Sequence, residues 1–151
     1  MAITQTLATS FKQELALAYH NFGTGPVRAS AAADTFKLAL YTSSATLDST
    51  TTVYTTSNEV PASGGYSAGG GTLVIAVAPT TSGTTAMLGF SDLTFTSTTI
   101  SGAYGAMIYN SSQGNRTVGI LNFGSSKSVT AGNFTVQFPS TDSTSAIIRI
   151  A

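Results

Sequence analysis

Apolar residues recur at helical spacing only near the start of the chain. The members of this pattern are Leu7, Phe11, Leu15 and Ala18. Residues separated by three or four positions share one face of an α-helix. Ser10 and Gln13 also have the spacing of a capping box. The pattern predicts a short amphipathic helix over residues 9–19, which ends at the sequence His20-Asn21-Phe22-Gly23.

From residue 35 onward, apolar and polar residues alternate instead with the two-residue period of β-strands. Turn-forming Gly, Pro, Asn and Ser separate the alternating segments, and the sequence NSSQGN is a good hairpin loop. The expected strands cover residues 36–41, 51–54, 73–77, 86–95, 106–109, 117–123, 134–138 and 147–150.

About eight strands with turns at short intervals predict a mainly all-β fold, a β-sandwich or jelly-roll-like domain with a short N-terminal amphipathic helix. We expect residues 1–23 to form a helix or arm, 24–34 a linker and 35–151 the β-sandwich domain. The helix either packs across the sandwich or docks on a neighbouring molecule.

The composition explains what the strands carry on their outer faces. Charged residues make up 8% of the 151 residues, with six basic and six acidic side chains, whereas a typical domain has roughly 25%. The chain contains 26 Thr and 20 Ser, but its eight Phe and six Tyr argue against disorder. The predicted surface is therefore hydroxylated and neutral. It offers no basic patch for nucleic acid or for anionic membranes.

Targeting signals and cysteine chemistry are not visible in the sequence. There is no Cys, which excludes disulfides and thiolate metal sites. The start has no basic segment followed by an apolar one, so we expect no signal peptide and synthesis in a host cytoplasm. No apolar run reaches the roughly 20 residues that a spanning helix needs.

The side chains that could carry chemistry all have simpler structural interpretations. His20 is the single histidine, no GxSxG motif accompanies it, and a cation there would suit the end of the helix. The six acids are dispersed, mostly at turns, where local hydrogen bonding is ordinary. The glycine-rich GGYSAGGG lacks the Lys of a phosphate loop. We therefore expect no catalytic residue, no metal, no cofactor and no small-molecule ligand.

Sugar binding is a minor alternative, because tyrosine rings can stack on sugars. Its candidate side chains are Tyr66, Tyr104 and Tyr109. The absence of Trp weakens this interpretation.

Several blocks of the sequence resemble a widespread family of small virion proteins of tailed bacteriophages. They are FKQELALAYHNF, DTFKLALYTSSATLDSTTTVYTTSNEV, GGYSAGGGTL, AMIYNSSQGNRTVGILNFGSS and FTVQFP. The resemblance covers nearly the whole chain and brings no catalytic motif. It implies a non-enzymatic structural protein located in the virion.

Within that class, the leading expectation is a head decoration (cement) protein that binds the major capsid protein and forms homo-oligomers, in particular trimers. Leu7, Phe11, Leu15 and Phe22 are the expected apolar contacts with the partner. Deleting residues 1–23 should then leave a folded protein that no longer binds capsids. The alternatives are a tail or head–tail junction component, a virion glycan- or receptor-binding module and, last, an enzyme.

Overall fold

The computed structural model describes residues 2–16, 18–23 and 33–151. Most of the predicted linker, residues 24–32, lies outside the described residues. The elements are β1 (Thr6–Leu7), α1 (Thr9–Ala16), β2 (Phe36–Thr42), β3 (Gly71–Thr72), β4 (Ile75–Ser82), β5 (Thr85–Phe90), β6 (Leu93–Asn110), β7 (Arg116–Val136) and β8 (Ile148–Ile150).

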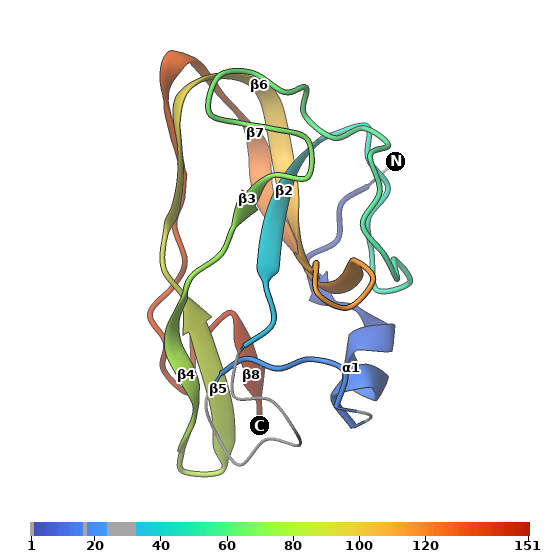
Figure 1. Cartoon of the computed structure of the whole chain (residues 1–151), viewed down its shortest axis with the longest axis vertical. Helices are drawn as coiled ribbons and strands as arrows, with labels where there is room; N and C mark the ends of the chain where they lie inside the picture. Colours follow the sequence, from blue (N-terminus) through green and yellow to red (C-terminus); the bar gives the residue numbers. More distant parts are fainter. Residues whose placement is uncertain (1, 17, 24–32) are drawn as a thin grey trace.

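The strands form two antiparallel sheets that pack together, as the sequence pattern predicts (Figure 1). The larger sheet has the order β1-β7-β6-β2-β3, and the smaller has the order β4-β5-β8. Every strand pair in both sheets is antiparallel. The predicted sandwich is confirmed, and the one described helix lies beside the larger sheet.

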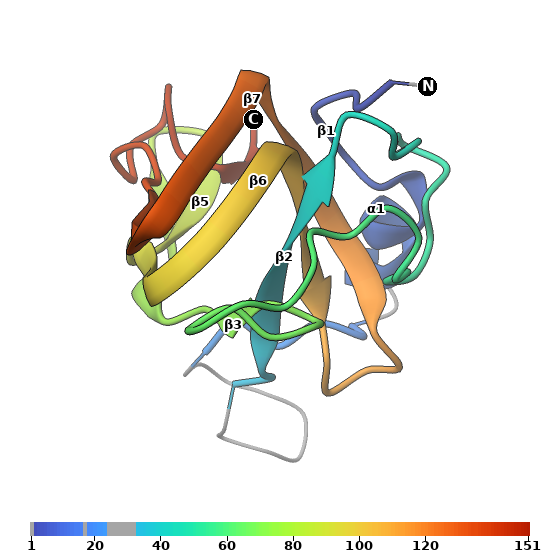
Figure 2. The same ribbon diagram turned by 90° about the horizontal axis from the view of Figure 1, so that it is seen from above.

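The hairpin of β6 and β7 forms the frame of the molecule. The two strands run together over the top of the molecule and bend there, so that their halves face different sides of the core (Figures 1 and 2). Their register shifts repeatedly between Phe95 and Gly105, and Ser97 and Gly102 have positive φ. Such irregularities bend a strand pair and increase its local twist.

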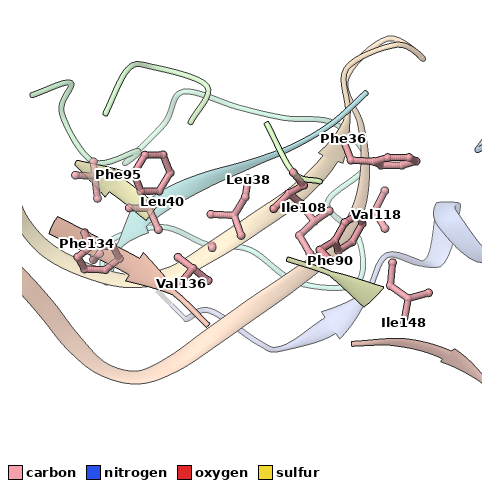
Figure 3. Packing of buried hydrophobic residues seen from close by; sticks show 14 of the residues in the cluster. Phe36, Leu38, Leu40, Phe90, Phe95, Ile108, Val118, Phe134, Val136 and Ile148 are labelled. Atoms are coloured by element: carbon pink, nitrogen blue, oxygen red, sulfur yellow. The ribbon is translucent and has the colours of Figure 1, made fainter. Parts of the chain in front are cut away.

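The main core lies between the sheets (Figure 3). Strand β2 contributes Phe36, Leu38 and Leu40, each at most 1% exposed. Facing side chains come from the other strands, among them Phe90, Phe95, Ile108, Val118, Phe134, Val136 and Ile148. The two-residue alternation of the sequence therefore marks the inward-facing side chains.

A second apolar cluster covers the opposite face of β2, which explains why Ala39 and Tyr41 are buried as well. Ala45 and Leu47, from the Thr-rich stretch after β2, belong to this cluster together with Met107. The Thr-rich stretch thus covers the outside of the larger sheet, while its many hydroxyls remain toward solvent.

The N-terminal segment is part of this single domain and not a separate arm. Ile3 forms a bridge with Leu47, and β1 pairs with β7 at Thr6 and Ile120. Phe11 of α1 is fully buried in the main core. Residues before the predicted boundary at residue 23 therefore pack on the sheets that follow it, because the helix supplies side chains to their core.

Three local predictions also differ from the structure. Residues 51–54 form only an isolated bridge, Val53 with Arg116, because this stretch packs as irregular cover. The helix ends at Ala16 rather than near residue 19. Ser10 lies within α1, and its Oγ is buried without a hydrogen-bond partner among the described residues, so Ser10 does not act as the predicted cap.

Candidate functional site

The four predicted contact residues pack against the protein's own core. Phe11 is 0% and Phe22 6% exposed, and the Phe22 ring stacks on Phe36 at a centroid distance of 4.4 Å. Leu7 and Leu15 are partly buried against the same cluster. Phe11 and Phe22 therefore cannot anchor a partner in this conformation, because helical periodicity cannot distinguish a face that binds a partner from one that packs internally.

His20 lies beside these residues in a buried network of polar side chains. Its Nε2 is 2.8 Å from Glu14 Oε2, and Arg116 donates from Nη1 to Glu14 Oε1 at 2.5 Å. On its other side, His20 Nδ1 is 3.0 Å from Asn110 Nδ2, which also donates to Asp34 Oδ2 at 2.8 Å. The network joins α1 and the chain around residues 20 and 34 to both strands of the long hairpin.

Asn110 fixes the protonation state of His20. Its amide nitrogen faces both His20 and Asp34, while its Oδ1 accepts from the backbone N–H of Ser112. An amide nitrogen can only donate, so His20 Nδ1 must accept and Nε2 must carry the proton given to Glu14. Reversing the amide would turn its oxygen toward the Asp34 carboxylate. The imidazole is therefore neutral.

The burial of His20 also favours the neutral form of its imidazole. Burial lowers the pKa of His20 below 6.5, and the hydrogen bond to Glu14 only partly opposes this effect. The sequence-based expectation of a histidine cation at a helix end is therefore wrong. No Ser hydroxyl hydrogen-bonds to His20 in the part of the chain that the structure describes. The arrangement holds α1 in place and lacks the parts of a nucleophilic triad.

A second polar cluster surrounds Glu59 on the outer face of the larger sheet. Its carboxylate accepts hydrogen bonds from Tyr54 Oη at 2.6 Å, Tyr66 Oη at 2.8 Å and the Gly69 backbone N–H at 2.7 Å. Tyr66 Oη in turn accepts from the Leu40 N–H at 2.9 Å, and Tyr109 donates to the Gly69 carbonyl at 2.7 Å. Glu59 thereby fastens the Thr-rich and glycine-rich loops to β2.

The tyrosines of this cluster are held as neutral donors. Burial raises the pKa of Tyr66, and the Glu59 carboxylate adds to the shift. Burial and Glu59 together also raise the pKa of Tyr54, and that of Tyr109 to about 12. Because Tyr66 and Tyr109 are 1% and 3% exposed, neither can stack on a sugar, which removes two of the three candidate sugar-binding rings.

The four other acids also accept hydrogen bonds from the chain itself. Asp48 and Asp142 bond to residues two or three positions ahead, as local turn bonding predicts. Asp92 instead accepts from the backbone N–H of Phe138, and Asp34 binds the side chain of Asn110. Local turn bonding thus accounts for two acids, whereas the others join distant segments.

The remaining sequence candidates are also accounted for. The structure shows no group of three or more metal-ligating side chains within the described ranges. In the glycine-rich segment, a Cβ at Gly65 or Gly70 would collide with backbone oxygens of Thr96 and Leu38. This loop therefore packs closely on its own sheets, which explains its lack of side chains.

The exposed strand surface carries hydroxyls. Thr94 and Thr135 face each other across β6 and β7 with their Oγ1 atoms 2.8 Å apart, and both residues are exposed. Further exposed hydroxyls follow on the same ribbon at Ser97, Thr99, Ser101, Ser125, Ser126, Ser128 and Thr130. Apart from the exposed Lys127, this stretch of the ribbon is uncharged, and its hydroxyls can form hydrogen bonds without requiring a countercharge.

Comparisons with known proteins found no match to a family model, to a curated protein or to a solved structure. No helix within the described ranges has the length and apolar character needed to cross a membrane.

Proposed function

We propose that this chain is a non-enzymatic structural protein of a tailed-bacteriophage virion, which decorates the capsid and stabilises it by binding the major capsid protein. The observation that supports this most is where the acidic side chains find their hydrogen-bond partners. All six acids are bound within the chain, while the exposed ribbon of β6 and β7 carries hydroxyls. Hydrogen bonds between uncharged groups depend little on salt, unlike contacts between exposed charges.

The resemblance of the sequence blocks to phage virion proteins supports the same proposal. The sandwich gives a rigid body with no assembled catalytic constellation among its described side chains. We expect it to act as a homo-oligomer, a trimer, in which several modest contacts add up through multivalency.

Copy number per virion tests the proposal. Quantitative mass spectrometry of purified virions should give a simple ratio of this protein to the major capsid protein. Six or twelve copies would place the protein in the tail or neck, and its absence from virions would refute a structural role in the particle.

A further inference from the structure

Hydrogen bonds around Asp34 and Asn110 hold residues 18–23 beside β6. The Asn21 N–H donates to Asp34 Oδ2 at 3.0 Å, and the Asp34 N–H donates to the Asn21 carbonyl at 2.9 Å. Asn110 Nδ2 lies 2.8 Å from Asp34 Oδ2 and 3.0 Å from His20 Nδ1. A change in the contact between His20 and Asn110 therefore also affects the group that orients Asp34.

A proton on His20 Nδ1 has no acceptor in this arrangement. Nδ1 faces the amide nitrogen of Asn110, and two donors cannot form a hydrogen bond with each other. Turning the Asn110 amide would bring its oxygen to His20, but that oxygen would then face the Asp34 carboxylate. The Ser112 N–H, which donates to Asn110 Oδ1 at 3.1 Å, would then face an amide nitrogen. The geometry of the network therefore excludes the imidazolium ion.

The charged groups around His20 do not reverse this preference. Glu14 on α1 and Asp34 attract a proton to the imidazole, whereas Arg116 on β7 repels it. Arg116 also donates to Glu14 Oε1, so part of the Glu14 charge is already compensated. The His20 side chain is fully buried and contacts the Phe11 ring, and burial lowers the pKa of His20 despite the two carboxylates. Protonation is therefore easier once His20 leaves this site.

We propose that mild acid releases residues 18–23 as a local unit, because His20 takes up a proton only when this segment detaches from β6. The remainder of the N-terminal segment stays in place. Phe11 is buried in the main core, and the ion pair between Glu14 and Arg116 does not require His20. The buried network thus acts as a pH-sensitive latch on one short segment of the fold.

The expected size of the effect follows from proton linkage. In the released segment, His20 should titrate near its ordinary pKa of 6.5, whereas in the folded network it stays neutral. The released form therefore binds more protons, and acid favours it. Between pH 7.5 and pH 5.5 its population should rise by up to about tenfold. Release separates the Phe22 ring from Phe36, on which it stacks at 4.4 Å, so aromatic surface becomes accessible to solvent.

Native-state hydrogen exchange of the full chain, followed by NMR, tests the proposal. The amides of Asn21 and Asp34 should exchange through a local opening that low concentrations of urea do not accelerate. After correction for the intrinsic exchange rate, their protection should fall by up to about tenfold between pH 7.5 and pH 5.5. Ser91, whose N–H donates to the Val74 carbonyl, is the control. Any exchange of the Ser91 amide that is independent of urea should also be independent of pH.

His20→Gln keeps a polar side chain that does not titrate, so the pH dependence at Asn21 and Asp34 should disappear. The ring nitrogen chemical shifts of wild-type His20 give a second readout that needs no variant. They should report an imidazole protonated only at Nε2 until the segment opens. Equal pH dependence in wild type and variant would overturn the proposal. So would an imidazolium ion while both amides keep their protection, or exchange of these amides only through urea-dependent global unfolding.

Discussion

Replacing Glu59 should test whether one carboxylate fastens the outer loops to the sandwich. Glu59→Ala removes the acceptor for Tyr54, Tyr66 and the Gly69 N–H, at donor–acceptor distances of 2.6, 2.8 and 2.7 Å. Hydrogen bonds to a charged group contribute about 1.5–3 kcal/mol each. Tyr54 is half-buried and can turn its hydroxyl to water, so we count mainly the other two donors. The expected loss is about 3–6 kcal/mol of unfolding free energy.

Glu59→Gln separates the charge from the shape of the side chain. The amide oxygen can still accept from Tyr66 and Gly69, and the Tyr54 hydroxyl can rotate to accept from the amide nitrogen. We therefore expect a smaller loss, about 1–2 kcal/mol. Asp48→Asn is the matched control, because it also removes one negative charge but from an exposed turn in which Asn can replace Asp. It should lower the melting temperature less than Glu59→Gln does, because its hydrogen bonds come from a local turn.

Thermal unfolding followed by circular dichroism measures these differences. A chain of this size loses about 3 °C in melting temperature per kcal/mol, so Glu59→Ala should melt roughly 9–18 °C lower than wild type. Equal melting of Glu59→Ala and Asp48→Asn would refute the view that Glu59 fastens the loops. A large loss in Asp48→Asn would equally show that removing any negative charge, and not the geometry at Glu59, is responsible.

Three further predictions follow from burial and protonation. Phe11→Ala should lower the free energy of unfolding in urea by about 3–5 kcal/mol. A chain lacking residues 1–23 should show no cooperative unfolding transition. A stable, folded truncation would support the separate-arm interpretation. Because the pKa of His20 is lowered in the fold, the unfolded chain binds a proton first below pH 6.5, so stability should fall from pH 7 to pH 5. His20→Gln should show a shallower fall, and an identical slope in both proteins would contradict the neutral imidazole. At alkaline pH the sign is opposite: the raised pKa values of Tyr54, Tyr66 and Tyr109 mean that the unfolded chain ionises first, so stability should fall as pH rises above 10. Ultraviolet absorbance of tyrosinate should rise together with unfolding, and ionisation of all six tyrosines before unfolding would refute this expectation.

The fold class was predictable because the inward-facing residues of β2 and β5 keep a two-residue alternation. The hairpin after Tyr109 was predictable from its turn residues. The continuity of β6 and β7 was not, because Gly124–Gly132 on β7 is largely exposed at the bend, and on β6 only Thr98 and Ile100 point inward between exposed Ser and Thr residues. A strand without a buried face has no apolar period, and its Gly and Ser residues then resemble a loop.

The N-terminal helix shows a different limit of sequence analysis. The apolar face of α1 was predicted from the sequence, but the sequence left open whether it packs across the sandwich or docks on a neighbouring molecule. Phe11 and Phe22 pack on the chain's own core, and the same spacing would suit a neighbouring molecule equally well. Only the arrangement of the sheets decides between these possibilities.

The Glu59 cluster carried a signal that the sequence analysis did not use. Glu59 is the only charged residue between Asp48 and Asp92. In so long an uncharged stretch, a lone carboxylate is a candidate for an internal hydrogen-bonding role, because its two oxygens can accept hydrogen bonds from several buried donors at once. That Tyr54 and Tyr66 converge on it depends on the path of an irregular loop, which has no periodic signature.

The same reasoning explains why so few charges suffice for this protein. Buried carboxylates add little net stability when paired, but removing one partner leaves costly unpaired groups, so they oppose alternative packings. The buried Glu14 acts in this way on α1. The partly buried Asp34 acts on the chain around Asn21, and the partly buried Glu59 acts on the loops, so that segments without regular structure have one favoured position. In the proposed function, the exposed hydroxyls of β6 and β7 are the groups that contact the partner. A surface of this kind requires rigidity more than charge, because weak uncharged contacts become selective only when the groups that make them are held in register.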